Sequence, residues 1–503
     1  MWILSPQVLV GSRSTHCVLS FIRLLRRHFA TIWRRVAKKS AATLKPIRIG
    51  SKRALQLARQ RDAVELLGWA VCVLPILAFV ADGGFNGLVD LQTGLNVVNR
   101  LTALAGTSLL LVHLLLVSRL PMVERVLGLD QMTGAHKRLG KPVLYLLLVH
   151  ALTSVATYAM ADGEALMETF IKLNLGYPSL LMASIGLLLM IMVVVTSIRA
   201  ARRRFSYEAW YLIHLLAYVS VGIAVPHQFE FGTELLGNIW LQAYFIALYV
   251  FTTLSILMFR ILAPILQSWR MNLRVSEVVP DRNNTSSIHV SGRGINRLEA
   301  EAGQFFMLRV LTPSQWWRPH PFSVSAPPNN SEIRFTIGNR GDDTAQLQLL
   351  KPGTRVILEG PYGIFSERKR TKPNVVLMAA GIGVSPVRAL AENLAAEPGD
   401  VTVIYRASSK ADAALLSELE EIADRRGHAL HLLTGESGKQ REWIPQAMLG
   451  KRPPYAVLVE LAPNILDSDI YICGPVAWAR QVVKTLDQLN VPENQIHVEE
   501  FAW

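Results

Sequence analysis

The chain has 503 residues, of which 51% are hydrophobic, and a formal net charge of +14, which leaves room for about three domains. Residues 1–62 contain 14 lysines and arginines but one acid, so the rest of the chain is close to neutral, and this distribution argues against a nucleic-acid enzyme. Three scattered cysteines (Cys17, Cys72 and Cys473) exclude a disulfide framework and a cysteine-based zinc site.

Residues 1–62 form a basic arm in which arginine and lysine alternate with large apolar residues. The pattern is typical of an amphipathic helix at an anionic cytoplasmic membrane surface. The alternative is an extension whose charge only fixes the membrane topology. The first residues lack a charged segment ahead of an apolar stretch, so we expect no cleaved signal peptide.

Six apolar stretches follow the arm, each long enough to cross a bilayer. They are residues 63–82, 98–118, 136–160, 178–199, 208–228 and 238–260. Lysine and arginine collect in the arm and in the second and fourth connections, whereas the other three connections carry acids. By the positive-inside rule, both termini are expected in the cytoplasm of a plasma (inner) membrane protein.

Four histidines lie inside two of these spans, His136 and His150 in the third and His214 and His227 in the fifth. Ionisable groups in a membrane span are costly and indicate function. Their spacings of 13 and 14 residues correspond to about 20 and 21 Å of helix. The topology pairs His136 with His214 at an inner level and His150 with His227 at an outer level. Two levels of paired imidazoles suit two bis-histidine haems; the alternative is four packed core histidines.

Three further details bear on this pattern. Thirteen residues do not return to the same helix face, so His227 is expected past a bend or a fraying helix end, for which Pro226 provides a cause. Arg100 and Arg119 flank the second span and would suit haem propionates, or they extend to the membrane interface as such side chains often do. His113 stands alone on an apolar face and is interpreted as a packed histidine outside the site.

Residues 271–368 change to short alternating runs with turn residues between them, which predicts a small antiparallel β-barrel. Two segments carry chemistry. The first, Arg318-Pro319-His320-Pro321-Phe322-Ser323, places an aromatic and a hydroxyl beside a basic residue. The second, from Gly341 to Thr344, places a glycine and a hydroxyl at a helix start, where free amides bind anions such as a pyrophosphate.

Residues 372–503 alternate strands with helices, as in an α/β nucleotide-binding domain. Gly381, Gly383 and Pro386 form a turn from a buried strand into a helix, where glycines let a phosphate approach the backbone. The next strand ends near Arg406 and Ser408, where an arginine and hydroxyls suit the 2′-phosphate of NADPH; the alternative is surface solvation. Cys473 and Gly474 follow a later strand, and the chain ends with Trp503.

Four motifs taken together resemble the ferric reductase and NADPH oxidase family over residues 62–503. They are HKRLG around His136, RRRFSYEAWYLIH up to His214, HPFS with the following GxxT, and GIGVSP followed by CGP. The resemblance implies a six-helix transmembrane haem bundle at residues 63–262, an FAD-binding barrel of ferredoxin-reductase type, and a nicotinamide domain. The implied cofactors are two b haems, FAD and NADPH.

The resemblance also implies roles for single residues. Phe322 and Ser323 would lie against the flavin, and Trp503 would stack on its isoalloxazine ring. Cys473 would lie near the nicotinamide. Arg100 and Arg119 match positions that contact haem propionates in the oxidase branch.

One departure from the oxidase branch affects the expected acceptor. That branch has a further histidine one turn after the outer ligand, whereas Thr153 and Ser154 follow His150 here. We therefore expect ferric chelates as the extracytoplasmic acceptor, with oxygen as the alternative and a quinone also open. A different class, a transporter or channel with a redox-sensing domain, would use the histidines as a proton or metal path. The oligomeric state is not predicted.

Overall fold

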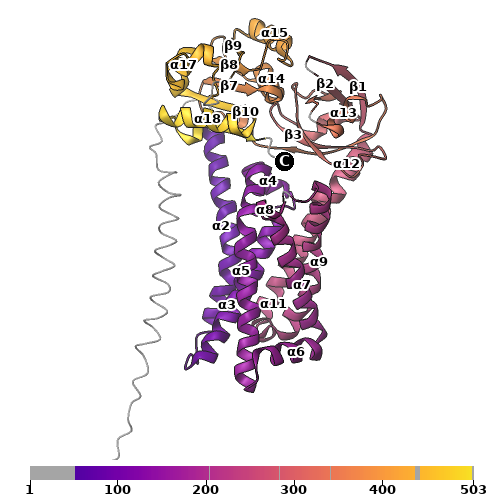
Figure 1. The fold of residues 1–503 in the computed structure, drawn as a ribbon, viewed down its shortest axis with the longest axis vertical. Helices are drawn as coiled ribbons and strands as arrows, with labels where there is room; N and C mark the ends of the chain where they lie inside the picture. The colour runs from indigo at the N-terminus through magenta and orange to yellow at the C-terminus, as the bar shows by residue number, and fades with distance from the viewer. Residues whose placement is uncertain (1–50, 203, 283, 340, 437–441, 501–503) are drawn as a thin grey trace, which may run out of the picture.

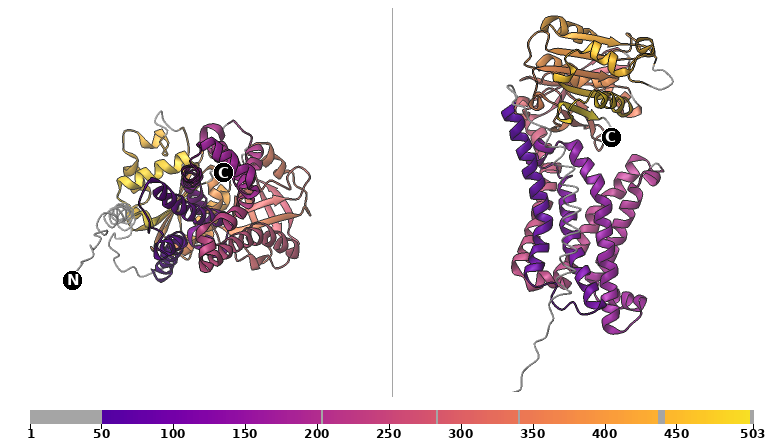
Figure 2. Two further views of the ribbon diagram at one scale, coloured as in Figure 1. Left: turned by 90° about the horizontal axis from the view of Figure 1, so that it is seen from below. Right: turned by 90° about the vertical axis from the view of Figure 1, so that its left-hand side faces the viewer.

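The computed structural model describes residues 51–202, 204–282, 284–339, 341–436 and 442–500. A bundle of long helices forms one end of the molecule and the β-sheets lie over the other end (Figure 1). The two further views show the same stacking (Figure 2). The N-terminal fifty residues of the basic arm and the chain end at residues 501–503, with Trp503, lie outside the described residues.

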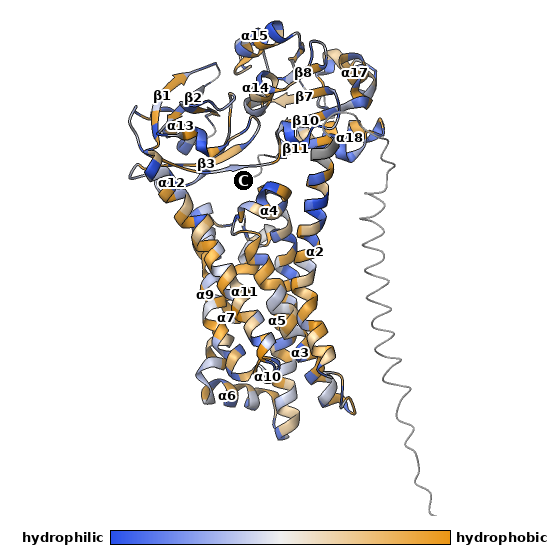
Figure 3. Ribbon diagram, turned by 180° about the vertical axis from the view of Figure 1, so that it is seen from behind, coloured by the Kyte–Doolittle hydropathy of each residue, from blue (hydrophilic) through white to orange (hydrophobic). Residues whose placement is uncertain are grey.

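Within the described part of the chain, six helices are long and apolar enough to cross a membrane, as the sequence predicted. These candidate spans are Leu55–Ala81, Leu91–Leu115, Leu129–Asp162, Pro178–Ser197, Tyr207–Phe231 and Ile239–Met271. They belong to α2 (Ser51–Ala81), α3 (Leu91–Leu115), α5 (Leu129–Asp162), α7 (Pro178–Ser197), α9 (Tyr207–Phe231) and the run from α11 (Ile239–Ser255) to α12 (Ala263–Met271). Hydrophobic colouring dominates their length (Figure 3).

The helices extend further than the apolar stretches. The first begins at Ser51 and the third at Leu129, several residues ahead of the predicted starts. The 34 residues of α5 span about 51 Å, well beyond a hydrocarbon core of about 30 Å. His136 therefore lies inside α5, two turns from its first residue, and not at a helix end.

Helix α9 continues through Pro226 to Phe231, so the expectation that His227 lies past a fraying end is wrong. Proline lacks an amide hydrogen and cannot donate to the carbonyl of Gly222, four residues earlier. Gly222 has no neighbouring atom within 4 Å of the position a Cβ would take, so this side of the helix has open space beside the proline. The helix accommodates the proline and keeps His227 within its last turns.

Short helices connect the spans. At the end next to the sheets these are α4 (Pro121–Leu127) and α8 (Arg199–Arg202); at the opposite end they are α6 (Leu166–Gly176) and α10 (Thr233–Gly237). The sixth span contains a π-helical segment, η1 (Ile256–Leu262), before α12 leads into the first strand. π-helical turns are rare and often occur at functional sites.

The predicted barrel consists of two three-stranded antiparallel sheets in the orders β1-β2-β5 and β4-β3-β6. Their strands are β1 (Arg274–Pro280), β2 (Thr285–Ser291), β3 (Phe305–Val310), β4 (His320–Ser323), β5 (Glu332–Gly338) and β6 (Val356–Tyr362). Isolated bridges, Arg274 to Arg355 and Val324 to Phe335, join the sheets. The six predicted strands are confirmed, although continuous ladders do not close the barrel.

The nucleotide-binding part has a five-stranded parallel sheet in the order β11-β10-β7-β8-β9. Its strands are β7 (Asn374–Ala380), β8 (Val401–Arg406), β9 (Ala429–Leu433), β10 (Ser468–Gly474) and β11 (Ile496–Glu500). The helices include α14 (Val384–Asn393), α15 (Leu416–Arg426), α16 (Gln446–Leu449), α17 (Pro454–Leu461) and α18 (Val476–Gln488). The predicted α/β domain is therefore present.

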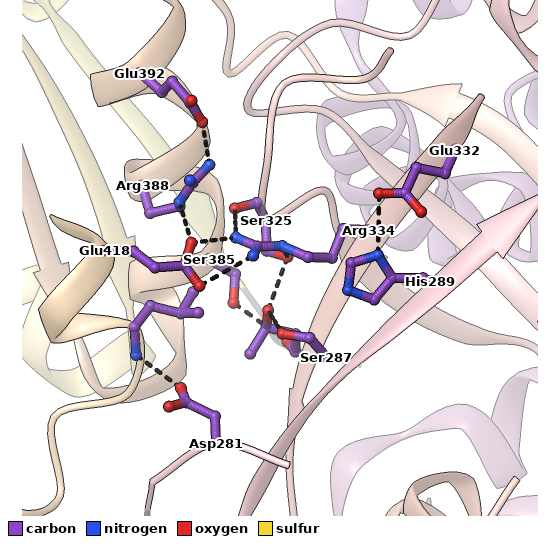
Figure 4. Close-up of polar contacts among 12 residues, drawn as sticks. Asp281, Ser287, His289, Ser325, Glu332, Arg334, Ser385, Arg388, Glu392 and Glu418 are labelled. Carbon is purple, nitrogen blue, oxygen red and sulfur yellow. Dashed lines mark hydrogen bonds and ion pairs between the residues drawn. The ribbon is translucent and has the colours of Figure 1, made fainter. Parts of the chain in front are cut away.

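One hydrophobic cluster continues from the barrel into this sheet, for example from Phe335 to Leu390 and Val403. Polar contacts surround the junction (Figure 4). Glu418 of α15 accepts hydrogen bonds from Arg334 of β5 at 2.8 and 3.0 Å and forms an ion pair with Arg388 of α14 at 2.8 Å. The barrel and the nucleotide sheet thus pack as neighbours with a shared core.

Candidate functional site

The structure brings the four predicted histidines together in two pairs. The ring centroids of His136 and His214 lie 6.1 Å apart, and those of His150 and His227 lie 6.4 Å apart. Each pair joins α5 to α9, and the two pairs are fourteen residues apart along α5, or about 21 Å. This is the pairing and the level separation that the sequence predicted.

The spacing within each pair fits a metal between the rings. An imidazole nitrogen lies about 2 Å from a metal it binds, and the ring centroid lies about 1 Å further, so two rings on opposite sides of one iron have centroids about 6 Å apart. Among the described residues, no group of three or more His, Cys, Asp or Glu could hold a metal ion. A pair of imidazoles can instead serve as the two axial ligands of a haem, because the porphyrin supplies the other ligands.

Helix α3 contacts both predicted histidines of α5 in the same reciprocal way. His113 Nε2 lies 2.9 Å from the backbone oxygen of His136, and His136 Nδ1 lies 3.2 Å from the backbone oxygen of His113. At the outer level, Asn99 Nδ2 donates to the backbone oxygen of His150 at 2.9 Å, and His150 Nδ1 lies 3.2 Å from the backbone oxygen of Asn99. A carbonyl only accepts, so each Nδ1 carries its hydrogen and Nε2 is free for a metal.

His214 and His227 on α9 have the same tautomer, but other contacts determine it. His214 Nδ1 lies 3.2 Å from Ser197 Oγ, whose hydroxyl hydrogen already goes to the backbone oxygen of Val193 at 2.7 Å. The serine oxygen can therefore only accept from His214. His227 Nδ1 bonds the backbone oxygen of Ala224. All four histidines thus present Nε2 for axial ligation.

His113 is the main residue that the sequence interpretation missed. Its ring stacks on His136, with centroids 3.8 Å apart and an angle of 7° between the planes. The signal was present in the spacing, because Asn99 and His113 are fourteen residues apart in α3, as His136 and His150 are in α5. Gly106, midway between them, allows close packing, since a Cβ there would lie 3.4 Å from Leu146 and Leu147.

The arginines that flank the second span contact carboxylates. Arg100 pairs with Glu234 of α10 and lies over the ring of Phe79. Arg119 pairs with Glu359 of β6, so it joins the bundle to the barrel. Burial lowers the pKa of Arg119 to about 10, and the guanidinium remains charged at neutral pH.

Arg260, in the π-helical segment, is a second residue that the sequence interpretation missed. It acts electrostatically on both rings of the inner pair and donates to the backbone oxygen of Val117 at 3.0 Å. A lone arginine within an apolar helix was the available signal. Arg260 is therefore a further candidate for an inner-haem propionate.

The flavin segment contains buried polar atoms without partners. Arg318 Nε, His320 Nε2 and Ser323 Oγ are buried and have no hydrogen-bond partner among the described residues. Burial lowers the pKa of His320, which favours its neutral ring. The rings of His320 and Phe322 are nearly parallel, with centroids 6.0 Å apart, and Pro321 between them pairs with Met307 of β3. Buried polar atoms without partners indicate a ligand site.

The second flavin segment lies next to the first. Arg318 forms an ion pair with Asp343, and Gln315 Nε2 donates to the backbone oxygen of Asp343 at 3.1 Å. Gly341 has φ of +129° and precedes α13 (Asp342–Gln348), and Thr344 Oγ1 bonds the Gly341 oxygen at 3.0 Å. Two aspartates in the first turn oppose an anion, so the helix start is a poorer pyrophosphate site than the sequence indicated.

The flavin segment also contacts the helix that carries the inner ligand. Arg318 Nη2 lies 3.0 Å from Glu208 Oε1, in the first turn of α9. His214 is six residues further, about 9 Å along the helix axis. Between them, Trp210 lies with its ring centroid 5.0 Å from that of His214. The predicted flavin site thus adjoins the inner histidine pair.

The nucleotide turn packs directly against the CGP segment. A Cβ on Gly383 would lie 2.2 Å from the backbone oxygen of Cys473, and one on Gly474 would lie 2.9 Å from Ala380. Gly381 has φ of +54°, and Pro386 is buried in the first turn of α14. The close contact with the end of β10 therefore already requires a glycine at position 383, without any bound phosphate. Burial raises the pKa of the Cys473 thiol, which stays protonated.

Arg406 does not extend freely into solvent. Its Nη2 donates to the backbone oxygen of Gly435 at 2.5 Å, and its Nη1 to that of Leu433 at 3.3 Å. Ser408 is exposed and its backbone oxygen accepts from the amide of Gly435 at 3.1 Å. A 2′-phosphate at this position would meet a guanidinium that already bonds to carbonyls.

Buried carboxyl groups lie where the bundle, the barrel and the nucleotide sheet meet. Glu124 of α4 accepts from the amide of Gly363 at 2.9 Å, and burial raises its pKa to about 7. Burial also raises the pKa of Glu499 of β11 well above its usual value, with Asp130 and Glu124 adding to the rise. No sequence motif marked these residues, because only the tertiary fold brings them together.

Three family models match successive parts of the chain. Residues 102–225 match the ferric reductase like transmembrane component, residues 270–366 an FAD-binding domain, and residues 377–484 an oxidoreductase NAD-binding domain. The chain has the architecture of the ferric reductase and NADPH oxidase family. FAD- and NAD-binding domains are therefore fused to a ferric reductase membrane domain with six apolar helices.

Two curated relatives each match less than half of the chain. A flavohemoprotein of Vibrio cholerae is 28% identical over 43% of the chain and 55% of its own length. The ferredoxin reductase component of a 3-ketosteroid-9-alpha-monooxygenase from Mycolicibacterium smegmatis is 26% identical over 46% of the chain and 65% of its own length. The chain thus spans between about half and two thirds of these relatives.

Among solved structures, the FAD/NAD-binding domain of a nitric oxide dioxygenase from Vibrio cholerae matches with 23% identity and a TM-score of 0.37. The match covers 46% of this chain and 98% of that one. A flavohemoglobin from Malassezia yamatoensis matches with 16% identity and a TM-score of 0.39, over 82% and 98% of the two chains.

Proposed function

We propose that the protein is a transmembrane oxidoreductase that passes electrons from cytoplasmic NADPH through FAD and two b haems to an acceptor across the membrane. The observation that carries this proposal is the two histidine pairs, each spaced for one iron and each with Nε2 free, beside a flavin segment with unpartnered buried polar atoms. We further propose that the membrane domain covers residues 63–262, the FAD domain residues 271–368 and the nucleotide domain residues 372–503.

The orientation rests on charge and on connectivity. The connections next to the sheets contain Arg119, Arg125 and Arg202, whereas Glu164, Glu168 and Glu234 lie at the other end. Basic connections remain in the cytoplasm. We therefore place the flavin and nucleotide domains, and both chain termini, on the cytoplasmic side of a plasma (inner) membrane.

The residues of the flavin and nucleotide segments would have different roles. When bound, FAD accepts a hydride and releases single electrons, which haem carries. Arg318, His320 and Ser323 would hold the flavin through their unpartnered atoms, and Phe322 would pack against it. Cys473 and Gly474, at the end of β10, would border the nicotinamide. Trp503 would cover the flavin face, a prediction that lies outside the described residues.

For the acceptor we propose ferric chelates. Two axial imidazoles leave no open iron position, which favours electron transfer over oxygen binding at iron. Thr153, one turn beyond His150, bonds the backbone oxygens of Val149 and His150 at 2.7 and 3.1 Å and thus has its hydroxyl hydrogen engaged. The outer site accordingly offers no histidine donor at this position for bound oxygen.

The experiment is NADPH-driven reduction of ferric citrate, oxygen and a soluble quinone by the full chain in proteoliposomes, with and without superoxide dismutase. We expect ferrous iron to form at a rate that superoxide dismutase does not change. Superoxide as the main product would favour an oxidase. Absence of a haem absorption band in the purified protein would instead favour a transporter or channel that uses the histidines as a path.

A further inference from the structure

A groove of about 600 Å³ lies beside α12, where the sixth span leads into the barrel. Figure 1 shows the place of α12 between the bundle and the sheets. Its lining combines apolar side chains with three arginines. The lining includes Met258, Leu266, Gln267, Arg270, Arg293 and Arg297. None of these lining residues belongs to the histidine pairs, the flavin segments or the nucleotide turn.

The backbone holds the three arginines near one another. Arg270 lies in the last turn of α12, and the amide of Arg293 donates to the backbone oxygen of Met271 at 2.7 Å. Gly292 permits this contact, because a Cβ there would lie 2.8 Å from the same oxygen. Arg297 follows in the short helix η2 (Ile295–Leu298). The basic wall of the groove is therefore built on ordered backbone.

The three guanidinium groups are exposed and have no hydrogen-bond or ion-pair partner within the described part of the chain. Neighbouring arginines differ: Arg260 bonds the backbone oxygen of Val117 at 3.0 Å, and Arg274 bonds that of Gly353 at 2.9 Å. Three adjacent positive charges without a carboxylate repel one another, and an anion between them would relieve that repulsion.

The groove lies at the depth of lipid headgroups. About 20 helical residues cross a hydrocarbon core, so a span that begins at Ile239 leaves the core near Met258, the lowest residue of the lining. Met258 and Leu266 are 47% and 43% exposed, and Trp269 is 74% exposed. Exposed tryptophan is typical of the membrane interface. The apolar wall therefore faces acyl chains, and the arginines lie above it.

We propose that this groove binds the headgroup of an anionic phospholipid from the cytoplasmic leaflet. The phosphate would lie among Arg270, Arg293 and Arg297, and the upper acyl chain would pack on Met258 and Leu266. Basic pockets at the cytoplasmic ends of spans bind anionic lipids in this way. A free phosphate or a soluble nucleotide would leave the apolar wall unused.

The groove lies next to a contact between the helix bundle and the barrel, so a bound lipid would affect that contact. Ser268 of α12 exchanges hydrogen bonds with Leu358 of β6, donating at 3.4 Å and accepting from the amide at 3.1 Å. The same strand carries Glu359, the partner of Arg119. A lipid bound beside α12 would thus add a contact between the membrane surface and the joint that carries the flavin domain.

The test compares full-length protein in nanodiscs of phosphatidylcholine alone and of phosphatidylcholine mixed with phosphatidylglycerol. A photoreactive benzoylphenylalanine in place of Gln267 would report crosslinking to labelled phosphatidylglycerol. The lipid variant replaces Arg270, Arg293 and Arg297 with glutamine. A charge-matched control replaces Arg425, Arg452 and Arg480, which are exposed on the nucleotide domain, and a third variant carries lysine at the three groove positions.

We expect crosslinking to phosphatidylglycerol in the otherwise unmodified protein and in the control. Affinity should be lower by on the order of a hundredfold in the glutamine variant, since each of the three basic residues near the surface contributes about fivefold. The lysine variant should retain much of the binding. Equal crosslinking in the glutamine variant would overturn the proposal. Competition by inorganic phosphate or ATP as strong as that by phosphatidylglycerol would assign the groove to a soluble anion instead. Haem content serves only as a folding control here.

Discussion

The two α5 histidines share a feature that the α9 histidines lack, a reciprocal contact with α3. His113 adds a stacked ring at the inner level, whereas Asn99 at the outer level has an amide. An Nδ1–H that donates to a carbonyl makes the imidazole a more basic ligand, which lowers the potential of the iron. In the proposed function, His113 and Asn99 would therefore be positioning residues for different haems.

Substitutions at these two positions should affect the two haems differently and so allow their signals to be told apart. His113→Gln keeps a donor for the His136 oxygen but removes the stacked ring. His113→Phe keeps a stacked ring but removes the donor. We expect both variants to retain two haems while the midpoint potential and low-spin EPR signal of one haem shift; Asn99→Ala should shift the other. Redox titration followed by EPR measures this. Identical shifts from both positions would contradict separate roles.

Glu124 should make stability depend on pH. Burial raises its folded pKa from 4.5 to about 7, so the folded state holds a proton that the unfolded state has lost between these values. Its contribution is full below pH 4.5 and is lost as pH rises to about 7, a difference of up to about 3 kcal/mol. Glu124→Gln should flatten this slope while keeping an acceptor for Gly363.

Thermal unfolding of the purified protein between pH 5 and about pH 8 measures the slope in both proteins. Glu460→Gln, at an exposed position in α17, is the matched control and should keep the slope of the unmodified chain. A slope that is unchanged in Glu124→Gln would show that this carboxyl does not hold the extra proton.

Arg406 bears on nucleotide choice. Arg406→Ala should raise KM for NADPH by about tenfold, more than KM for NADH, because it removes a charged partner for the 2′-phosphate. The backbone oxygens of Leu433 and Gly435 also lose a donor, so some loss for both nucleotides is expected. Steady-state kinetics with each nucleotide measures the ratio, and an equal change would mean that Arg406 serves only the loop.

At the scale of single residues, the sequence predicted the four histidines because their spacing repeats along two helices. It could not predict the contact of His113 with His136, which depends on the register between α3 and α5. For the same reason it did not predict that Arg119 would contact Glu359, 240 positions away. Local patterns carry periodicity, whereas partners are determined by the tertiary fold.

At the scale of elements, the alternation and the turn residues predicted the six strands of the barrel, whereas their order within the two sheets came from the structure. Helix ends were not, because α2 and α5 continue beyond the hydrocarbon core with polar residues that hydropathy does not detect. Pro226 was expected to bend α9 or to mark a fraying end; a fraying end is wrong, because the helix continues to Phe231. The joining of barrel and nucleotide sheet through Glu418 had no sequence signal.

Glu418→Ala should loosen that junction. The substitution leaves Arg334 and Arg388 facing each other without the carboxylate that now bonds both. Charged hydrogen bonds contribute about 2 kcal/mol, so we expect a loss of this order and faster hydrogen exchange in β5 and α14. Hydrogen-exchange mass spectrometry measures it. Glu420→Ala, on the same helix with a 3.6 Å contact to Lys410, should change little; similar exchange in both variants would contradict the bridge.

At the scale of the whole molecule, the domains lie in the order that electron transfer from a nicotinamide nucleotide through a flavin to the histidine pairs would require. The nucleotide sheet shares a core with the barrel, the barrel contacts α9 through Arg318 and Glu208, and α9 carries one ligand of each histidine pair. The sequence motifs and their order along the chain predicted the identity of each domain. Their contacts, including the buried carboxyl groups at the junction, came only from the structure.

The most direct test of the account is anaerobic reduction of the purified full chain by NADPH, followed through the haem absorption bands together with haem quantification. We predict two b haems per chain, both reduced by NADPH. In His136→Ala and in His214→Ala, one haem should remain, and its reduction by NADPH should be much slower. A protein without haem, or with two haems that NADPH does not reduce while FAD is bound, would contradict the proposed path.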